Sequence, residues 1–211
     1  CRKFNDEPEK ASRPMSASAG GFVPGAGGAI LILEALETAQ KRGARIYAEI
    51  IGGAVNCGGH RMGGSMTAPN PEGVVRCVRM AVGDAGIDPQ EIDAINGHLT
   101  ATFADPYELK NWSNALGRGP EKFPYINSTK SMIGHCLGAT GAIECAAVVL
   151  QLYKDFIHPS LNCEDIHPEI TEYADRIPHR VIENAGARVI AKAGFGFGDV
   201  NSCLIFKKWE E

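Results

Sequence analysis

The stretch "NSTKSMIGHCLGATGAIECAAVVLQ", residues 127–151, contains the end of a strand, a loop and the start of a helix in direct succession. Residues 137–155 are apolar nearly all round, and such a helix is expected in the interior of a protein. Glycines and alanines in its first turns allow another backbone to pack closely. A lysine, a histidine and a glutamate, Lys130, His135 and Glu144, interrupt this small and apolar surrounding and therefore mark a candidate site.

Outward from this stretch, strand and helix patterns alternate along the chain. We predict strands at 27–34, 45–55, 91–97 and 123–128, and helices at 35–43, 71–86, 105–117 and 137–155. Asp105 is expected to cap the third helix, with Glu108 completing a capping box. The segments 187–193 and 200–208 should form a hairpin around the turn "GFGFGD". This order predicts an α/β fold in which helices are layered on a mixed β-sheet.

Composition excludes several classes of function. The 211 residues are 44% hydrophobic and 22% charged with a net charge of -4, and no Lys/Arg run is present, so we expect no nucleic-acid partner. The longest apolar run is too short to span a membrane and the first residues lack a signal-peptide core, which predicts a cytoplasmic protein. The seven cysteines form no C-x-x-C pair and are predicted to be reduced core thiols, and Cys57 with His60 lacks a third group for a metal site.

Two histidines follow predicted strands, where ligands bind in layered α/β proteins. His98 follows the strand "DAIN", and His135 follows "YINS". Either one alone could be a structural loop histidine, but their shared placement favours a site. The amides at the start of the helix after His135 favour an anion nearby. Glu144 in that helix needs a cationic partner, for which Lys130 is the nearest candidate, and an ion pair that only fixes the loop is the structural alternative.

Three motifs resemble those of a known family. "NGHLTAT" (96–102), "NSTKSMIGHCLGATGAIE" (127–144) and "GFGFGDVN" (194–201), in this order and spacing, resemble the β-ketoacyl-acyl-carrier-protein synthases, closest to the synthase II type. The resemblance covers the whole chain. It implies a thiolase-like fold of two similar halves, with residues 1–44 at the end of the N-terminal half and 45–211 as the C-terminal domain. The family's catalytic cysteine belongs to the first half and is expected outside these residues.

The resemblance also implies roles for individual residues. His98 and His135 match the two histidines of a Cys-His-His site, and Lys130 and Glu144 match the lysine and glutamate that support it. The expected substrate-binding residues are Thr67, Thr100, Thr102, Phe195 and Phe197, of which Thr100 and Thr102 match the contacts of the phosphopantetheine arm. The Phe197 amide matches an oxyanion-hole donor. No metal and no cofactor are expected, because the substrates are carried on the phosphopantetheine of acyl carrier protein.

The implied reaction is the decarboxylative Claisen condensation of malonyl-acyl-carrier protein with an acyl thioester, in which two imidazoles stabilise the enolate. The expected partners are acyl carrier protein, the missing N-terminal half, and a second subunit in a homodimer or a ketosynthase heterodimer. Two alternatives stay open: a non-catalytic subunit like a chain-length factor, and a thiolase-like acyltransferase that does not decarboxylate. None of the seven cysteines has a good claim to be the nucleophile.

Several positions depart from the family pattern: Leu99, Ala101, Phe103, Ala193, Gly194 and Asp199. We expect these residues to crowd the edge of the site and to change its charge. The strand at 27–34 should lack its proper neighbours and leave an apolar patch exposed. Removing Lys130 alone should destabilise the protein by roughly 3–5 kcal/mol, and removing Glu144 as well should recover part of that loss.

Overall fold

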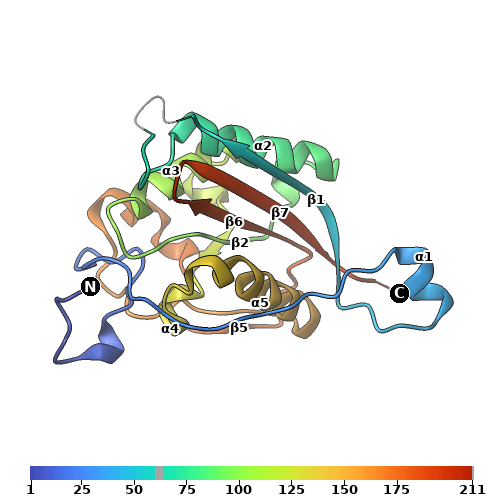
Figure 1. The fold of residues 1–211 in the computed structure, drawn as a ribbon, viewed down its shortest axis with the longest axis horizontal. Coiled ribbons are helices and arrows are strands. Elements are labelled where there is room, and N and C mark those ends of the chain that lie inside the picture. Colours follow the sequence, from blue (N-terminus) through green and yellow to red (C-terminus); the bar gives the residue numbers. More distant parts are fainter. Residues whose placement is uncertain (60–63, 211) are drawn as a thin grey trace.

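A five-stranded mixed sheet lies at the centre of the computed structural model, which describes residues 1–59 and 64–210 (Figure 1). Its strand order is β1 (Ala48–Cys57), β7 (Val200–Lys208), β6 (Val189–Gly196), β2 (Ala94–Asn96) and β3 (Tyr125–Asn127). The pairs β1/β7 and β7/β6 are antiparallel, whereas β6/β2 and β2/β3 are parallel. The predicted mixed sheet and C-terminal hairpin are therefore confirmed.

Helices cover both faces of this sheet. Because side chains alternate along a strand, Ile205 joins the core under α2 (Pro71–Ala85) and α3 (Asp105–Leu116), while Phe206 joins the core under α5 (Thr140–Lys154). Figure 1 shows α2 and α5 on opposite sides of the sheet. The shorter elements are η1 (Pro8–Lys10), α1 (Leu36–Lys41), η2 (Pro89–Glu91), η3 (Pro120–Lys122), α4 (Lys130–Ile133), η4 (Leu137–Ala139), β4 (Phe156–Ile157), η5 (Pro168–Arg176) and β5 (Ile182–Glu183).

Local signals define the ends of α2 but not the start of α3. The Asn70 side chain accepts hydrogen bonds from the amides of Glu72 and Gly73, and Gly86 ends α2 in the left-handed conformation. The predicted capping box at Asp105 is wrong: Ala104 is the N-cap, and no side chain caps it. The carboxylates of Asp105 and Glu108 instead accept hydrogen bonds from backbone amides of the preceding loop.

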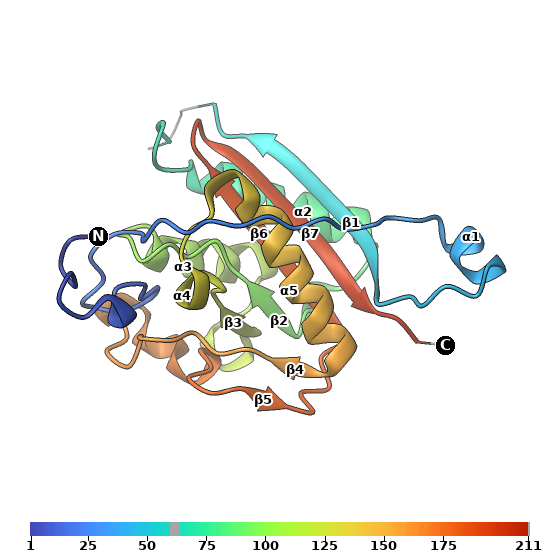
Figure 2. The ribbon, with the colours of Figure 1, turned by 60° about the horizontal axis from the view of Figure 1, so that its bottom comes forward.

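The segment 27–34 is extended but is not a buried strand, so that prediction is wrong. It belongs to no sheet of the described chain, and Ile30, Ile32 and Leu33 are 86%, 85% and 72% exposed. Its apolar pattern is typical of a strand, yet a strand also needs a hydrogen-bonded neighbour. The expectation of an unpartnered segment with exposed apolar side chains is confirmed. Figure 2 shows this segment running past α5 toward α1.

The helix α5 is also less buried than its sequence suggests. Its inner face packs on the sheet through Cys145, Val148 and Leu152, whereas Leu150 is 49% exposed. The Ile143 side chain lies against the extended segment at Gly27. Within the described residues, no helix is both long and apolar enough to cross a membrane.

Candidate active site

Two parallel strands bring the candidate histidines together. Asn96 at the end of β2 pairs with Asn127 at the end of β3, so the loops that follow both strands leave the same edge of the sheet. His98 lies in the first loop and His135 in the second, after α4. Their ring centroids are 5.3 Å apart, with an angle of 83° between the ring planes. The sequence predicted that each histidine follows a strand, and the pairing of β2 with β3 brings the two rings into contact.

The environment of His135 determines which ring nitrogen carries its proton. The Leu137 amide donates to Nδ1 at 3.2 Å, and Thr140 Oγ1 lies 3.0 Å from the same atom. Nδ1 is therefore an acceptor, and in the neutral ring the proton is on Nε2. The His135 amide donates to the Val23 carbonyl at 2.7 Å, which anchors the N-terminal segment to this loop. Burial and the Lys130 ammonium lower the pKa of His135, which favours the neutral imidazole.

Two carboxylates of α3 hold the loop that carries His98. Glu108 accepts hydrogen bonds from the amides of His98 and Leu99 at 2.7 and 2.8 Å. Asp105 accepts from the amides of Thr100 and Ala101 at 2.9 and 3.0 Å. Burial raises the pKa of Glu108 to about 7. Sequence reasoning assigned both residues to a helix cap, and no local pattern distinguishes a cap from this longer-range clamp.

The imidazole of His98 is kept neutral. Burial, followed by the nearby ammonium groups of Lys130 and Lys192, holds its pKa well below the usual value. Its Nδ1 atom is buried without a hydrogen-bond partner among the described residues. Phe195 packs against the ring, with centroids 6.0 Å apart. A neutral ring in this position can donate or accept one proton at the site.

Glu144 binds two lysines rather than one. Lys130 Nζ lies 2.5 Å from Glu144 Oε1, as the sequence predicted, and Lys192 Nζ lies 2.7 Å from Oε2. All three side chains are at most 4% exposed. Sequence reasoning missed Lys192. The signal that could have identified it is a charged residue inside the otherwise apolar strand β6, on the same face as the buried Ile190.

A pocket of about 670 Å³ opens beside these groups. Its lining includes His98, His135, Cys145, Lys192, Phe195 and Phe197. Phe195 is 8% exposed and Phe197 63%, because Phe197 lies in the turn between β6 and β7. The first residues of α5, Thr140 and Gly141, complete one side.

The three predicted substrate-binding threonines do not line this pocket. The hydroxyls of Thr100 and Thr102 lie 3.0 Å apart, and both residues are half-buried in the loop that carries His98. Thr67 is exposed in the loop that precedes α2. This loop contacts the β6–β7 turn, since the Gly198 amide donates to the Met66 carbonyl at 2.9 Å.

Most departures from the family pattern do not crowd the site, contrary to expectation. Leu99 and Ala101 are buried, with Leu99 in the core under α2 and α3. Asp199 is also buried, and its carboxylate accepts a hydrogen bond from the Asn70 amide at 2.7 Å. Phe103 faces solvent. Among the six departing positions, Gly194 is the one that lines the pocket. His60, the partner suggested for Cys57, lies outside the described residues.

Comparison with known proteins identifies the family. The profile described as "Beta-ketoacyl synthase, C-terminal domain" matches residues 47–164. The 3-oxoacyl-[acyl-carrier-protein] synthase 1 of Haemophilus influenzae is 44% identical over 98% of this chain, and the match covers 48% of that protein.

Solved structures agree with this match. The ishigamide ketosynthase/chain length factor superposes with a TM-score of 0.85 at 34% identity, covering 95% of this chain and 47% of that chain. A type II polyketide synthase ketosynthase in complex with its acyl-carrier protein, AntDE:AntF, gives a TM-score of 0.84 at 32% identity, covering 97% and 49%. The chain spans about half the length, or less, of the curated relatives that it matches. By its sequence match and its mixed α/β fold, the chain belongs to the β-ketoacyl synthase family and contains that family's C-terminal domain.

Proposed function

We propose that this chain supplies the histidine-bearing part of a 3-oxoacyl-[acyl-carrier-protein] synthase. Residues 45–211 form the C-terminal domain in this proposal, and residues 1–44 end the N-terminal half. The reaction is the decarboxylative Claisen condensation of malonyl-acyl-carrier protein with an acyl thioester, in fatty-acid or polyketide synthesis. The observation that carries the proposal is the contact between two neutral imidazoles, with ring centroids 5.3 Å apart, beside an open pocket.

The site chemistry suits this reaction. When malonyl thioester loses CO₂, the carbon–carbon bond breaks and its electron pair moves into the thioester as an enolate. The Nε2–H group of His135 can donate a hydrogen bond to the enolate oxygen, and the neutral ring of His98 supplies a second polar group. The enolate carbon then attacks the acyl thioester carbonyl, and the thiolate that carried the acyl group leaves.

Other residues would position the groups that react. Lys130 and Glu144, in contact at 2.5 Å, fix α4 against α5 beside the histidines. Thr100 and Thr102 would contact the phosphopantetheine arm, and Phe197 would contribute its amide to the oxyanion hole and its ring to the acyl pocket. Phe195 would border the same pocket. Thr67 would bind substrate from the loop that contacts the β6–β7 turn.

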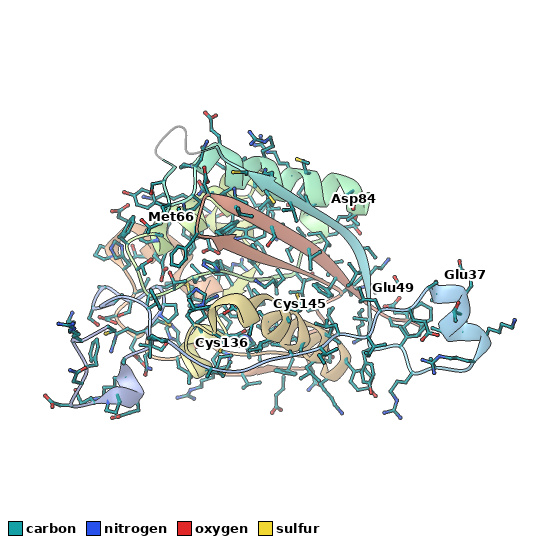
Figure 3. All side chains as sticks on the ribbon, viewed as in Figure 1. Glu37, Glu49, Met66, Asp84, Cys136 and Cys145 are labelled. Atoms are coloured by element: carbon teal, nitrogen blue, oxygen red, sulfur yellow. The ribbon has the colours of Figure 1, made fainter. Side chains whose placement is uncertain are left out.

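We place the nucleophilic thiol outside this chain. Burial raises the pKa of Cys145, which lines the pocket, so its thiol is protonated near neutral pH. Burial also raises the pKa of Cys77, Cys163 and Cys203. Cys136 is buried at the loop before α5, and Figure 3 labels it together with Cys145 of α5. The missing cysteine would come from an N-terminal half, in the same polypeptide or in a partner.

Acyl carrier protein is the proposed substrate carrier, supported by the relative solved with its acyl-carrier protein. A homodimer or a ketosynthase heterodimer would be the working assembly. The alternative is a non-catalytic subunit like a chain-length factor, since one similar solved structure is the ishigamide ketosynthase/chain length factor. The presence of both histidines in one pocket, with the Lys130 charge acting on both, favours the catalytic function.

The test replaces each histidine in the assembled enzyme, this chain together with the part that supplies the thiol. His98→Ala or His135→Ala should lower malonyl decarboxylation by about 10² or more, the range for losing one proton-transfer or oxyanion donor. Acyl loading of the cysteine should change less. Decarboxylation at the parent rate in either variant would refute the assignment of the two histidines to catalysis. A parent protein that is itself inactive but raises the activity of a partner synthase would support the chain-length-factor alternative.

A further inference from the structure

Lys192 is a buried lysine in the wall of the pocket. Lys192 lies on β6 and pairs with Asn96 of β2. Asn96 comes two residues before His98. The Lys192 side chain is 4% exposed. It lines the same pocket as His98 and His135. A lysine is rarely buried unless it is paired, so its presence here requires a reason.

The Lys192 ammonium has capacity for another partner. Of its three N–H groups, one donates to the Ala193 carbonyl. Nζ also lies 2.7 Å from Glu144 Oε2, an ion pair that lacks hydrogen-bond geometry. The ammonium therefore has N–H groups without a hydrogen-bond partner among the described residues. The neighbouring pocket residue, Gly194, leaves space beside this ammonium, because a Cβ atom at that position would lie 3.6 Å from Nζ.

The charges around the pocket leave this wall positive. Lys130 and Lys192 share one carboxylate, Glu144. His98 and His135 are neutral because burial lowers the pKa of each. The charge of Glu108 also acts on Lys130, but Glu108 has a pKa of about 7 and accepts hydrogen bonds from two backbone amides, so it offsets the positive charge only in part. The N-terminal end of α5 adds a positive dipole at Thr140 and Gly141.

We propose that Lys192 binds the carboxylate of the anionic extender thioester, through the ammonium face that Gly194 leaves open to the pocket. This inference rests on the proposed function and names the group that recognises the malonyl unit. Negative charge leaves the carboxylate as CO₂ forms, so the contact strengthens substrate binding and does not accelerate bond cleavage. Its loss should therefore raise KM for the malonyl thioester without lowering kcat.

The test compares Lys192→Met with Lys192→Arg in the assembled enzyme, using malonyl-acyl-carrier protein for decarboxylation and an acyl-carrier thioester without a carboxylate for loading. Lys192→Met should raise KM for the malonyl substrate about tenfold or more, the value of a hydrogen bond to a charged group. KM for loading should stay within about twofold, and Lys192→Arg should keep most of the malonyl affinity. Thermal melts check that the variants fold. Lys192→Met should fold, because Glu144 still pairs with Lys130 in that variant.

Gly194→Ala is the second variant, because it removes neither partner of the two ion pairs and places a methyl group 3.6 Å from Lys192 Nζ, with the Ser202 hydroxyl, 3.1 Å from the same methyl group, shifting slightly to admit it. It should also raise KM for the malonyl substrate. An unchanged malonyl KM in Lys192→Met, or a loss of kcat at constant KM, would overturn the inference and assign Lys192 a purely structural role. If Lys192→Met does not fold, an unchanged KM in Gly194→Ala overturns it. A parent enzyme that does not decarboxylate malonyl thioester would instead overturn the proposed function.

Discussion

The two ion pairs of Glu144 make a quantitative prediction about stability. Breaking a buried ion pair by removing one partner costs about 3–5 kcal/mol, because a charge is left without compensation. In Lys130→Met, however, Glu144 keeps Lys192 at 2.7 Å. We therefore expect a smaller loss of about 1–3 kcal/mol, below the 3–5 kcal/mol that a simple pair would give.

Removing the carboxylate should be the most damaging single change. Glu144→Leu leaves two ammonium groups buried, on side chains that are 2% and 4% exposed. The expected loss is about 5 kcal/mol or more, comparable with the whole stability of many domains. The double variant Lys130→Met/Glu144→Leu still leaves Lys192 unpaired, so it should lose about 3–5 kcal/mol. The triple variant that also contains Lys192→Met leaves no charge and should recover most of the loss.

Urea unfolding of the purified chain at pH 7, followed by circular dichroism, measures this series. The order of decreasing stability should be parent, Lys130→Met, the double variant and Glu144→Leu, with the triple variant above the double one. An isolated Lys130–Glu144 pair would give a different result, in which the double variant is more stable than Lys130→Met. That result would refute the three-residue arrangement.

The remaining predictions concern pH and thiol chemistry. Burial raises the pKa of Glu108 in the native state to about 7, from an ordinary value of 4.5. Between these pH values the native state holds a proton that the unfolded state releases. The free energy of unfolding should therefore fall by up to about 3 kcal/mol as pH rises from 4.5 to 7. Glu108→Gln cannot titrate and should remove this part of the slope in urea titrations; a slope equal to the parent's would contradict the assignment. The purified chain should form no stoichiometric acyl adduct with an acyl-carrier thioester, because burial raises the pKa of Cys145, its pocket-lining thiol. Intact-mass measurement checks this, and an adduct on any cysteine would contradict it.

Local patterns in the sequence were sufficient for several elements. The helix α2 follows from its apolar spacing and from a proline and a glycine near its two ends, and the β6–β7 hairpin follows from two apolar runs around a glycine-rich turn. The position of each of His98 and His135 after a strand also follows from short-range signals. Such features depend on residues close in sequence, whereas the pairing of β2 with β3 that brings both histidines to one sheet edge does not.

Other features depend on partners that are far apart in sequence. The apolar segment 27–34 has the pattern of a strand, but a strand forms only where a neighbour supplies hydrogen bonds, and the described chain supplies none. Asp105 and Glu108 have the spacing of a helix cap, but the fold directs their carboxylates to the loop amides that hold His98. Lys192 pairs with Glu144, 48 residues before it, only because β6 packs against α5. The sequence alone determined which residues are titratable and apolar, whereas tertiary packing decided their partners, because burial removes water and leaves each charge to the groups that the fold places beside it.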